Sequence, residues 1–553
     1  MKAYAQALAI GLLLAGGLGA PRPALGQQSG WQWTATMGRA VSLNLLWEGA
    51  AAGALVATAD GGAVVGGTYE DYVVVGSGPG DTLRGAGTLN GMLVRYGAAG
   101  QKQWAVSLRG AGVGFGFGKL ANDGPQNLLC TVVHTASLTL PSGVVLPGEG
   151  TAWYRYSAAT GTVLGAGEIN RGNLDVRSLE VDANGSAVLT GGYVGQGTIG
   201  PYPVGQSTLS RSGVFITRFS PAGVPLWVRQ MTSTGSGSHG MLGQAVLPNG
   251  DVLIGGAFQG NVALDATYQF VSNGALGFLA CYNGSTGTVR WARTVSVGVQ
   301  PLVDAASGQA YVAGEFTGTL NLDGLAPVAG GLDLFIARLN PATGLAQSLV
   351  FAGGGPGDQR IGQLIVNNGQ FVLSGSGQGG ATDFGPGLTL PATSPTSGVW
   401  YVLTIGAQTG PIRLYQSPVG GVALATDPGG DPFLLCNTRQ QPVRFGQLPV
   451  ITPRGRGEVV LAHVGLVLGT KAAGAAAARL AVYPNPAAPR GSVTVRCAWA
   501  QAQVRVHDVV GRQLWQGQLR GGQATVPIGW PAGVYLLEVA SGGQRATQRL
   551  LVE

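Results

Sequence analysis

The sequence is poor in the residues on which most catalysis and metal binding depend. Only 10% of its 553 residues are charged, and it contains four histidines and four cysteines. The histidines (His134, His239, His463 and His507) show neither H-x-x-x-H nor H-E-x-x-H spacing, which argues against a zinc site. We therefore predict no metal-binding residue and no cofactor.

Nucleophile and phosphate motifs are missing as well. No G-x-S-x-G occurs, and GSGSHG at 235–240 lacks the strand-to-helix context of a nucleophile elbow, so we expect a flexible loop there. The glycine-rich stretches 110–118 and 351–360 resemble phosphate loops, but no helical pattern follows either. Carboxylates in expected loops cannot be shown to converge from their spacing: Asp71, Asp81 and Asp358. We predict no catalytic residue.

Concentrated charge and long apolar runs are also absent. The formal net charge is +7, spread over the whole chain, and no Lys/Arg cluster has interleaved aromatics. This pattern argues against a nucleic-acid partner. Beyond the N-terminal region no apolar run reaches 18 residues, so we expect the mature protein to be soluble or tethered by other means.

The N-terminus has the features of a secretory signal. Lys2 precedes an apolar run at 7–18, which is too short to span a bilayer comfortably. Ala24 and Gly26 place small residues at the −3 and −1 positions before Gln27. We predict a cleaved signal peptide at 1–26, with a membrane anchor as the alternative, and we do not expect a lipoprotein because no Cys follows the cut.

Some of the 97 glycines recur at a regular spacing within a repeated sequence pattern. The segment VLPNGDVLIGG at 246–256 has two apolar runs around Asn-Gly, a signal for a hairpin with a type I′ turn. The same pattern recurs about every 60 residues. The predicted turn glycines are Gly61, Gly124, Gly185, Gly250, Gly308, Gly369 and Gly430.

A second hairpin pattern keeps step with the first. GVFITRFSPAG at 213–223 is followed by a strand that opens near Trp227, and Trp104 and Trp291 hold the same place in their repeats. We expect a repeated core contact at these tryptophans. With a third strand in the variable segment between the two patterns, each repeat carries about four antiparallel strands.

Seven four-stranded repeats predict an all-β fold, a β-propeller of about seven blades at 27–468. An open array of β-sandwiches is the alternative, but a sandwich needs about 100 residues per unit. Within this repeat Cys130, Cys281 and Cys436 replace aliphatic residues, so we expect buried free thiols. The spacing of the cysteines, Cys497 included, predicts no disulfide.

LFIARLNPATG at 334–344 and DAASGQAYVAGEFTG at 304–318 match the repeat units of secreted bacterial β-propeller proteins. The resemblance covers about residues 31–468. It implies a fold and no particular chemistry.

The chain changes character after Leu468. An Ala/Gly-rich segment at 469–478 is typical of a linker. From 479 to 553, seven short alternating runs separated by turn signals predict a compact Ig- or fibronectin-like β-sandwich.

This module resembles the type A C-terminal sorting domain of the type IX secretion system. Four elements carry the resemblance in order: YPNP, then D-x-x-G-R, then AGVYLLEV, then QRLLVE. Arg549 stands where the common terminal Lys is found, which keeps the charge. The matching residues are Tyr483, Pro484, Asn485, Pro486, Asp508, Gly511, Arg512, Gly533, Tyr535 and Arg549.

The resemblance implies a route and partners. Family members cross the inner membrane by their signal and then cross the outer membrane through the type IX machinery. They are attached to surface lipopolysaccharide or released, usually after loss of the sorting domain. An ordinary terminal fibronectin-like module is the alternative.

Two functions remain open for the propeller. The first is a non-catalytic module at the cell surface, or secreted, that binds a glycan or protein ligand through its loops. The second is a secreted enzyme that degrades polysaccharide or protein, with its site in the propeller funnel. The low charge and few histidines favour the first.

Overall fold

In the computed structural model, contacts divide the chain into a unit of Gly30–Gly465 and a second unit that holds the residues from Leu466 to the C-terminus. Every regular element in the described residues is a β-strand. The predicted signal peptide and linker lie outside the described residues. These are 28–38, 52–69, 72–76, 78, 80–85, 90–108, 115–205, 212–385, 388–393, 398–438, 441–453, 458–467, 480–497, 499–508, 512–541 and 544–552.

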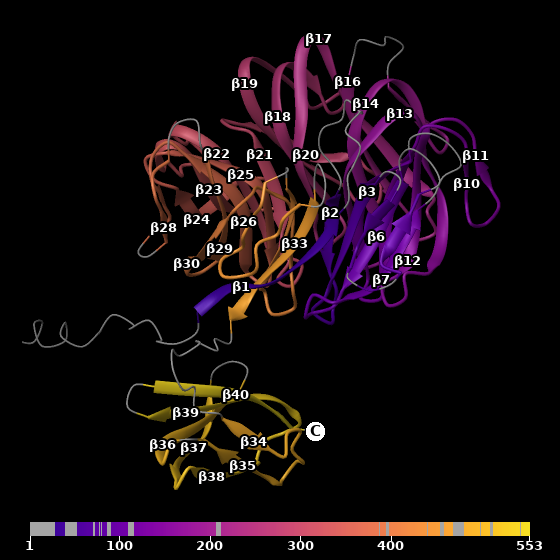
Figure 1. Ribbon diagram of the computed structural model, residues 1–553. Helices are drawn as coiled ribbons and strands as arrows, with labels where there is room; N and C mark the ends of the chain where they lie inside the picture. Colours follow the sequence, from indigo (N-terminus) through magenta and orange to yellow (C-terminus); the bar gives the residue numbers. More distant parts are fainter. Residues whose placement is uncertain are drawn as a thin grey trace, which may run out of the picture. The chain divides into compact units, whose positions relative to one another are not determined.

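We divide the strands of the first unit, which Figure 1 shows, into seven four-stranded antiparallel blades, numbered one to seven. Two long strands, β13 and β17, each belong to two neighbouring blades and so join blades two, three and four into one continuous sheet. Blade one is β2 (Ala52–Ala57), β3 (Ala63–Tyr69), β6 (Asn90–Tyr96) and β7 (Lys102–Leu108). Blade two is β8 (Phe115–Asp123), β9 (Asn127–His134), β12 (Gly150–Ser157) and the first part of β13 (Val163–Val181). Blade three is the rest of β13, β14 (Ala187–Ile199), β16 (Ser212–Phe219) and the first part of β17 (Pro225–Val246).

The remaining blades repeat the plan. Blade four is the rest of β17, β18 (Val252–Ala263), β19 (Gln269–Tyr282) and β20 (Val289–Val295). Blade five is β21 (Val299–Val303), β22 (Ala310–Thr319), β23 (Val328–Leu339) and β24 (Ala346–Gly353). Blade six is β25 (Asp358–Asn367), β26 (Gln370–Gln378), β29 (Gly398–Gly406) and β30 (Gly410–Ser417).

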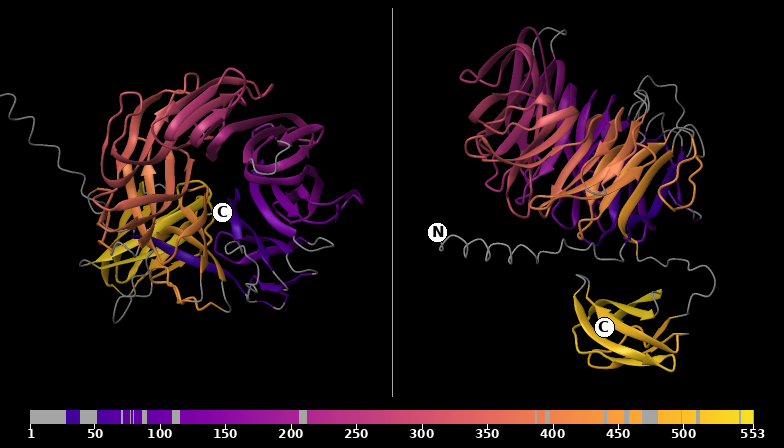
Figure 2. Two further views of the ribbon diagram at one scale, coloured as in Figure 1. Left: turned by 90° about the horizontal axis from the view of Figure 1, so that it is seen from above. Right: turned by 90° about the vertical axis from the view of Figure 1, so that its left-hand side faces the viewer.

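Blade seven is built from both ends of the unit. It contains β31 (Gly421–Thr426), β32 (Pro432–Thr438), β33 (Glu458–Val467) and, hydrogen-bonded beside β33, β1 (Gln28–Gly38). The Trp31 ring meets Phe445 edge-on at 4.8 Å, and Gln32 hydrogen-bonds His463 at 3.1 Å. The N-terminal strand therefore closes the ring, which the left view of Figure 2 shows running around one axis.

The remaining strands of this unit are short additions to the blades. β15 extends β14, and β4 with β5 continues from the end of β1. Two isolated hairpins, β10–β11 and β27–β28, lie in the segments between second and third strands. Their bounds are β4 (Tyr72–Val74), β5 (Thr82–Arg84), β10 (Leu138–Thr139), β11 (Val145–Leu146), β15 (Tyr202–Gly205), β27 (Thr382–Asp383) and β28 (Thr389–Leu390).

Each blade begins with the hairpin that the repeat predicts. All seven turn glycines have positive φ, between 69° and 85°, where a Cβ would be strained. The predicted type I′ turn occurs at blade six, where Asn368 and Gly369 are both at positive φ. It is wrong elsewhere: among described residues other than glycine, only Asp323 and Arg490 share positive φ with Asn368. Most of these hairpins are instead closed by a turn that ends in a left-handed glycine, as in the bonds from Gly250 N to Leu247 O and from Leu247 N to Asp251 O.

The tryptophan position that the repeats share makes a contact between neighbouring blades. Trp227 is 3% exposed and donates from Nε1 to the carbonyl of Gly284, at 2.8 Å, in the last hairpin of blade four. Its ring lies against Gly287, whose φ is +69°. The equivalent bonds are Trp33 to Ala98 (2.9 Å), Trp104 to Ala158 (3.0 Å) and Trp291 to Pro341 (2.9 Å).

The blade interiors are apolar. Free cysteines are part of them, because Cys130, Cys281 and Cys436 are buried and unpaired, as expected; the fourth, Cys497, is buried in the core of the C-terminal unit. Burial raises the pKa of the Cys281 thiol to about 12. The expected loop at 235–240 is wrong, because this backbone lies inside β17 and pairs with β18 on both sides of a register shift.

Seven strands of the C-terminal unit form two sheets around their own core. The hydrogen-bonded order of the strands is β34-β35-β38-β37-β36-β39-β40. We divide it between β38 and β37, which share a single residue pair, into a sheet of β34-β35-β38 and a sheet of β37-β36-β39-β40. The sheets join at the β37–β38 turn, where Arg520 pairs with Gln523. The bounds are β34 (Ala481–Tyr483), β35 (Ser492–Arg496), β36 (Gln501–His507), β37 (Gln513–Arg520), β38 (Gln523–Pro527), β39 (Gly533–Ser541) and β40 (Gln544–Val552).

This order of three and four strands is the arrangement of a fibronectin-like sandwich. The core contains Val493, Val504, Leu537 and Leu550, each fully buried. The predicted fold class, a propeller of seven blades followed by a small β-sandwich, is confirmed.

Candidate functional site

The inner strands of four blades enclose an axial cavity of about 430 Å³. Because the first hairpins of blades one, two and seven take part, it opens at the hairpin end of the ring. Its lining is mainly aliphatic, small or amide-bearing. Residues from each blade include Val56 and Ala59, Asn122 and Pro125, Ile365 and Asn367, and Ala425 and Asp427.

The polar groups of this lining join neighbouring blades. Asn122 donates to the carbonyl of Ala57 at 3.1 Å, and Asn367 donates to the hydroxyl of Thr426 at 2.9 Å. Asp427 contacts Nε2 of His463 at 3.2 Å. Burial is the largest single influence and would raise the pKa of Asp427. The hydrogen bond and charge interaction with His463, together with the backbone N–H groups of Asp431 and Gly429, outweigh it and hold the pKa below its usual value. The cavity is therefore a shaped surface with little free charge.

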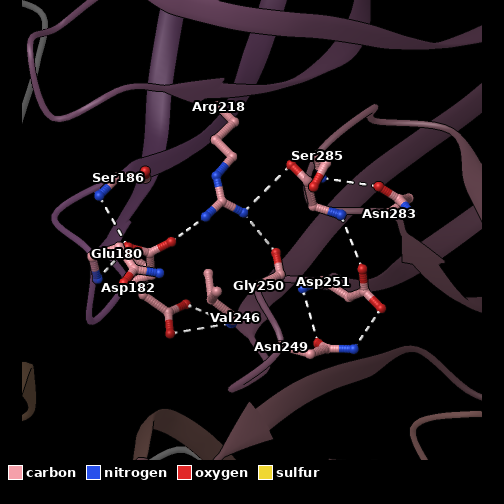
Figure 3. Close-up of polar contacts among 12 residues, drawn as sticks. Glu180, Asp182, Ser186, Arg218, Val246, Asn249, Gly250, Asp251, Asn283 and Ser285 are labelled. Carbon is pink, nitrogen blue, oxygen red and sulfur yellow. Dashed lines mark hydrogen bonds and ion pairs between the residues drawn. The ribbon is translucent and has the colours of Figure 1, made fainter.

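An ionic network crosses from blade three to blade four (Figure 3). Arg218, on β16, pairs with Asp182 in the first hairpin of its own blade and donates to the carbonyl of Gly250, at 2.6 Å, in the next blade. Asp182 also accepts bonds from backbone N–H groups in its own turn. Both charges are almost fully enclosed, with 9% and 7% of their side chains exposed.

The same network recurs in blades one and two. In each, an arginine of the third strand pairs with an aspartate of the first hairpin and donates to a carbonyl of the following blade. The sets are Arg95 with Asp60 and Ala158, and Arg155 with Asp123 and Pro221. Because these charges are engaged in joining blades, we assign them a structural role.

Glu180, on the inner part of β13, makes a further contact between blades three and four. Both its carboxylate oxygens accept from the N–H of Val246, at 3.1 and 3.2 Å (Figure 3). Burial raises the pKa of Glu180 to about 7, and Asp182 adds to the shift.

Of the carboxylates considered from the sequence, the two that the structure describes, Asp81 and Asp358, bond to separate partners. Asp81 pairs with Lys102 on the outer strand of blade one. Asp358 accepts from the N–H of Leu332, at 3.0 Å, near the inner strand of blade six. Asp71 lies outside the described residues. Among the described residues, no group of three His, Cys, Asp or Glu side chains has a geometry that would hold a metal ion.

The YPNP segment of the sandwich holds the C-terminal strand. Asn485 donates from Nδ2 to the carbonyl of Arg549 (2.7 Å) and accepts at Oδ1 from the N–H of Leu551 (2.8 Å). The N–H of Ala487 donates to the carbonyl of Leu551 at 2.8 Å. We call these three bonds the terminal latch. The peptide bonds before Pro484 and Pro486 are cis, and Arg496 lies over the ring of the exposed Tyr483, 5.4 Å from its centroid.

The other predicted motif residues lie at turns of the sandwich. Asp508 accepts from the N–H of Arg512 (2.8 Å) and from its Nε (3.0 Å), which closes the turn after β36. Tyr535 donates to the carbonyl of Pro531 at 2.6 Å, the tyrosine corner of such sandwiches. Gly533 begins β39, opposite Val552. Gly511 lies outside the described residues.

Sequence reasoning missed two features. The arginines that join blades fall at one position of the repeat, in LVRYG, WYRYS and ITRFS, so an alignment of the repeats with one another would have found them. The terminal latch had no comparable signal, because its partners are 64 and 66 residues apart in the sequence. The side chain of Asn485 makes two of its three bonds, and its partners are backbone groups, which leave no pattern in the sequence.

Among the described residues, no helix is long and apolar enough to cross a membrane. Residues 481–553 match the family described as the secretion system C-terminal sorting domain. Among curated proteins, none matches the chain.

Three solved structures are similar to this chain at low identity. The acylaminoacyl peptidase of Pyrococcus horikoshii is 6% identical, with 81% of this chain and 58% of that chain covered and a TM-score of 0.39. The apocarotenoid oxygenase of Synechocystis is 14% identical, with 63% and 78% covered and a TM-score of 0.32. PorZ, a surface component of the type-IX secretion system of Porphyromonas gingivalis, is 11% identical, with 92% and 100% covered and a TM-score of 0.14. At these scores the fold assignment depends on the strand topology, not on the likenesses.

Proposed function

We propose that this chain, whose residues 481–553 are a secretion system C-terminal sorting domain, is an exported β-propeller protein that binds a ligand at the cell surface or after secretion. The family match, on a complete seven-stranded sandwich, is the observation that carries the proposal. The sorting domain marks the chain for the type IX machinery, and the propeller is its cargo.

The route has two stages. Residues 1–26 direct the chain across the inner membrane and are removed, and the sorting domain then directs the folded protein from the periplasm across the outer membrane. The cargo is attached to surface lipopolysaccharide or released. The separate compactness of Gly30–Gly465 supports a cargo that folds without the sorting domain.

Binding is favoured over catalysis by the chemistry of the axial cavity. Its volume of about 430 Å³ suits a small ligand or a protruding loop. Its aliphatic, threonine and asparagine lining offers shape and hydrogen bonds, and its carboxylate, Asp427, is engaged with His463. A glycan or protein ligand fits this surface. The alternative, a polysaccharide- or protein-degrading enzyme, would need reactive groups placed elsewhere at the ring.

Cell fractionation tests the export part. The full chain and a chain that lacks residues 479–553 are produced in a bacterium with a type IX system, and the surface, medium and periplasm are assayed separately. We expect the full chain at the surface or in the medium and the truncated chain in the periplasm. A truncated chain that still reaches the surface overturns the sorting role.

Ligand binding is tested on the propeller, residues 27–468. Glycan arrays and candidate surface proteins are probed with it, and the same ligands are assayed for cleavage products. Binding without product release supports the proposal. Release of sugars or peptides would favour the enzyme instead. Matched variants at the cavity, such as Asn122→Ala and Asn367→Ala, locate any binding to the axial mouth.

A further inference from the structure

The strand β40 lies at the edge of its sheet and is long and regular. It pairs with β39 over nine consecutive residues, from Ser541–Gln544 to Gly533–Val552, without a bulge. The strand at the other end of the hydrogen-bonded order, β34, has only three residues. Edge strands of soluble proteins are commonly shortened, bulged or interrupted by proline, because their free backbone groups invite pairing with another chain. The strand β40 has none of these three protections: it is long, has no bulge and contains no proline.

The terminal latch fixes which backbone groups of β40 face outward. Leu551 uses both its N–H and its carbonyl in the latch, so both point away from β39. Outward groups recur at every second residue of an antiparallel strand. The N–H and carbonyl of Thr547 and Arg545 therefore point outward too, as does the N–H of Arg549.

The latch covers only the end of this edge. Asn485 and Ala487 engage outward groups at Arg549 and Leu551. None of the hydrogen bonds or strand pairs within the described residues engages the outward groups of Thr547, which is also exposed. The outer edge of β40 is therefore bonded at its C-terminal end, at Arg549 and Leu551, while the outward backbone groups of Thr547 can accept a further strand.

We propose that the export machinery reads β40 by strand addition: an extended segment of its receptor pairs with the outward backbone groups at Arg545, Thr547 and Arg549. The inference rests on the proposed sorting function. Main-chain pairing supplies the affinity in this mode of recognition, and alternate side chains supply the specificity. The outward face offers Thr547 and the exposed Arg549, because Leu550 and Val552 point into the core. An acidic or polar receptor strand complements that face.

The latch makes this address depend on folding. Asn485 reaches β40 from 64 to 66 residues earlier in the chain, so its bonds exist only when both ends of the domain have come together. An unfolded tail presents the same residues without a fixed edge. The edge therefore distinguishes a folded sorting domain from a nascent one, and Asn485 is a positioning residue for it.

Proline at residue 547 is the sharpest test. Thr547→Pro removes an outward N–H and leaves the bonds to β39 intact, which is where edge strands tolerate proline. In the full chain we expect a folded sorting domain, by its melting temperature, and surface export reduced by up to about tenfold, the factor that the loss of one hydrogen bond produces. Thr547→Val keeps the N–H and serves as the matched control, with export close to wild type.

The outcomes separate this inference from the sorting function. If folded Thr547→Pro is exported like wild type, strand addition at this edge is wrong while the sorting role stands. If the chain without residues 479–553 is exported, the sorting role itself is wrong. Should Thr547→Pro fail to fold, Arg545→Pro, at the next outward position and farther from the latch, is measured against the same two outcomes.

The positioning role of Asn485 has its own readout. In Asn485→Ala we expect faster amide exchange at Leu551 and reduced export, while the remaining core amides stay protected. The control Gln513→Ala removes an exposed side-chain bond to Gln516 on a different strand and should change neither. Fast exchange at Leu551 with normal export would overturn the need for a fixed edge.

Discussion

At the scale of single residues, Trp227 shows how one side chain joins two blades. It combines near-complete burial, contact with Gly287 and a hydrogen bond to Gly284. We expect Trp227→Ala to lower the unfolding free energy of the propeller by about 3–5 kcal/mol, because a large cavity opens and a carbonyl loses its donor. Urea unfolding measures this. Trp400→Ala, at a site 41% exposed, is the control, and an equal loss of stability there would contradict the role of Trp227 in joining the blades.

Glu180 makes the joint between blades three and four sensitive to pH. Its pKa is about 7 in the folded protein, raised by burial from an ordinary value near 4.5. A raised pKa favours the protonated form in the folded state, so this stability is present at low pH and lost as pH rises through about 7. We expect a loss of about 1–2 kcal/mol between pH 5 and pH 8, less than the full shift because the side chain keeps some exposure.

The variant Glu180→Gln isolates this effect, since it keeps the acceptor for Val246 without the charge. The difference in stability between pH 5 and pH 8 should shrink in the variant. Thermal unfolding at both pH values measures it, and the exposed ion pair of Asp175 with Arg177 gives the control Asp175→Asn. An unchanged pH dependence in Glu180→Gln would assign the effect to other groups.

Residue roles were predictable from the sequence only where a repeat displayed them. Trp104, Trp227 and Trp291 occupy one repeat position, and that position proved to be a shared contact. Trp33 makes the same bond from the N-terminal strand, outside any complete repeat, and was not predicted. Glu180 has no counterpart that would have marked it, because its environment is set by the approach of two separate strands.

At the scale of elements, the first hairpin of each blade depends on its glycine. Gly61 has a φ of +82°, and a Cβ there would meet only the Ala98 side chain at 3.5 Å, so backbone strain dominates. We expect Gly61→Ala to destabilise the propeller by about 1–2 kcal/mol. Gly53→Ala, on the same hairpin with open space around it, should be close to neutral. Equal effects on the melting temperature would show that φ is not the cause.

The hairpins were predictable because glycine and its flanking apolar runs are local signals. Turn type was not, because Asp-Gly and Asn-Gly also suit a turn in which glycine alone is left-handed. The segment 235–240 shows the opposite limit. Its composition indicates a loop, yet pairing with β18 keeps the backbone in a strand. Neighbouring strands can outweigh local preference in a sheet.

At the scale of the whole molecule, β1 is the element that turns an open arc into a ring. We expect a chain without residues 28–38 to lose the edge protection of β33 and the packing of Trp31 on Phe445. The free edge should promote self-association. Size-exclusion chromatography and thermal unfolding measure both effects. A monomer with the wild-type melting temperature would contradict the closing role, and removal of residues 479–553, which belong to the other compact unit, is the control.

The pairing of β1 with β33 also determines when during synthesis the propeller can finish folding. β1 leaves the ribosome first, but its partner His463 is 431 residues later. During synthesis the first strand of the propeller therefore has no partner until almost the last strand has been made. Contacts this distant in sequence slow folding and lengthen the exposure of unpaired edges. The pairing of β1 with β33 completes the propeller just before the sorting domain begins in the sequence. Under the proposed function, recognition of the folded sorting domain therefore follows closure of the ring.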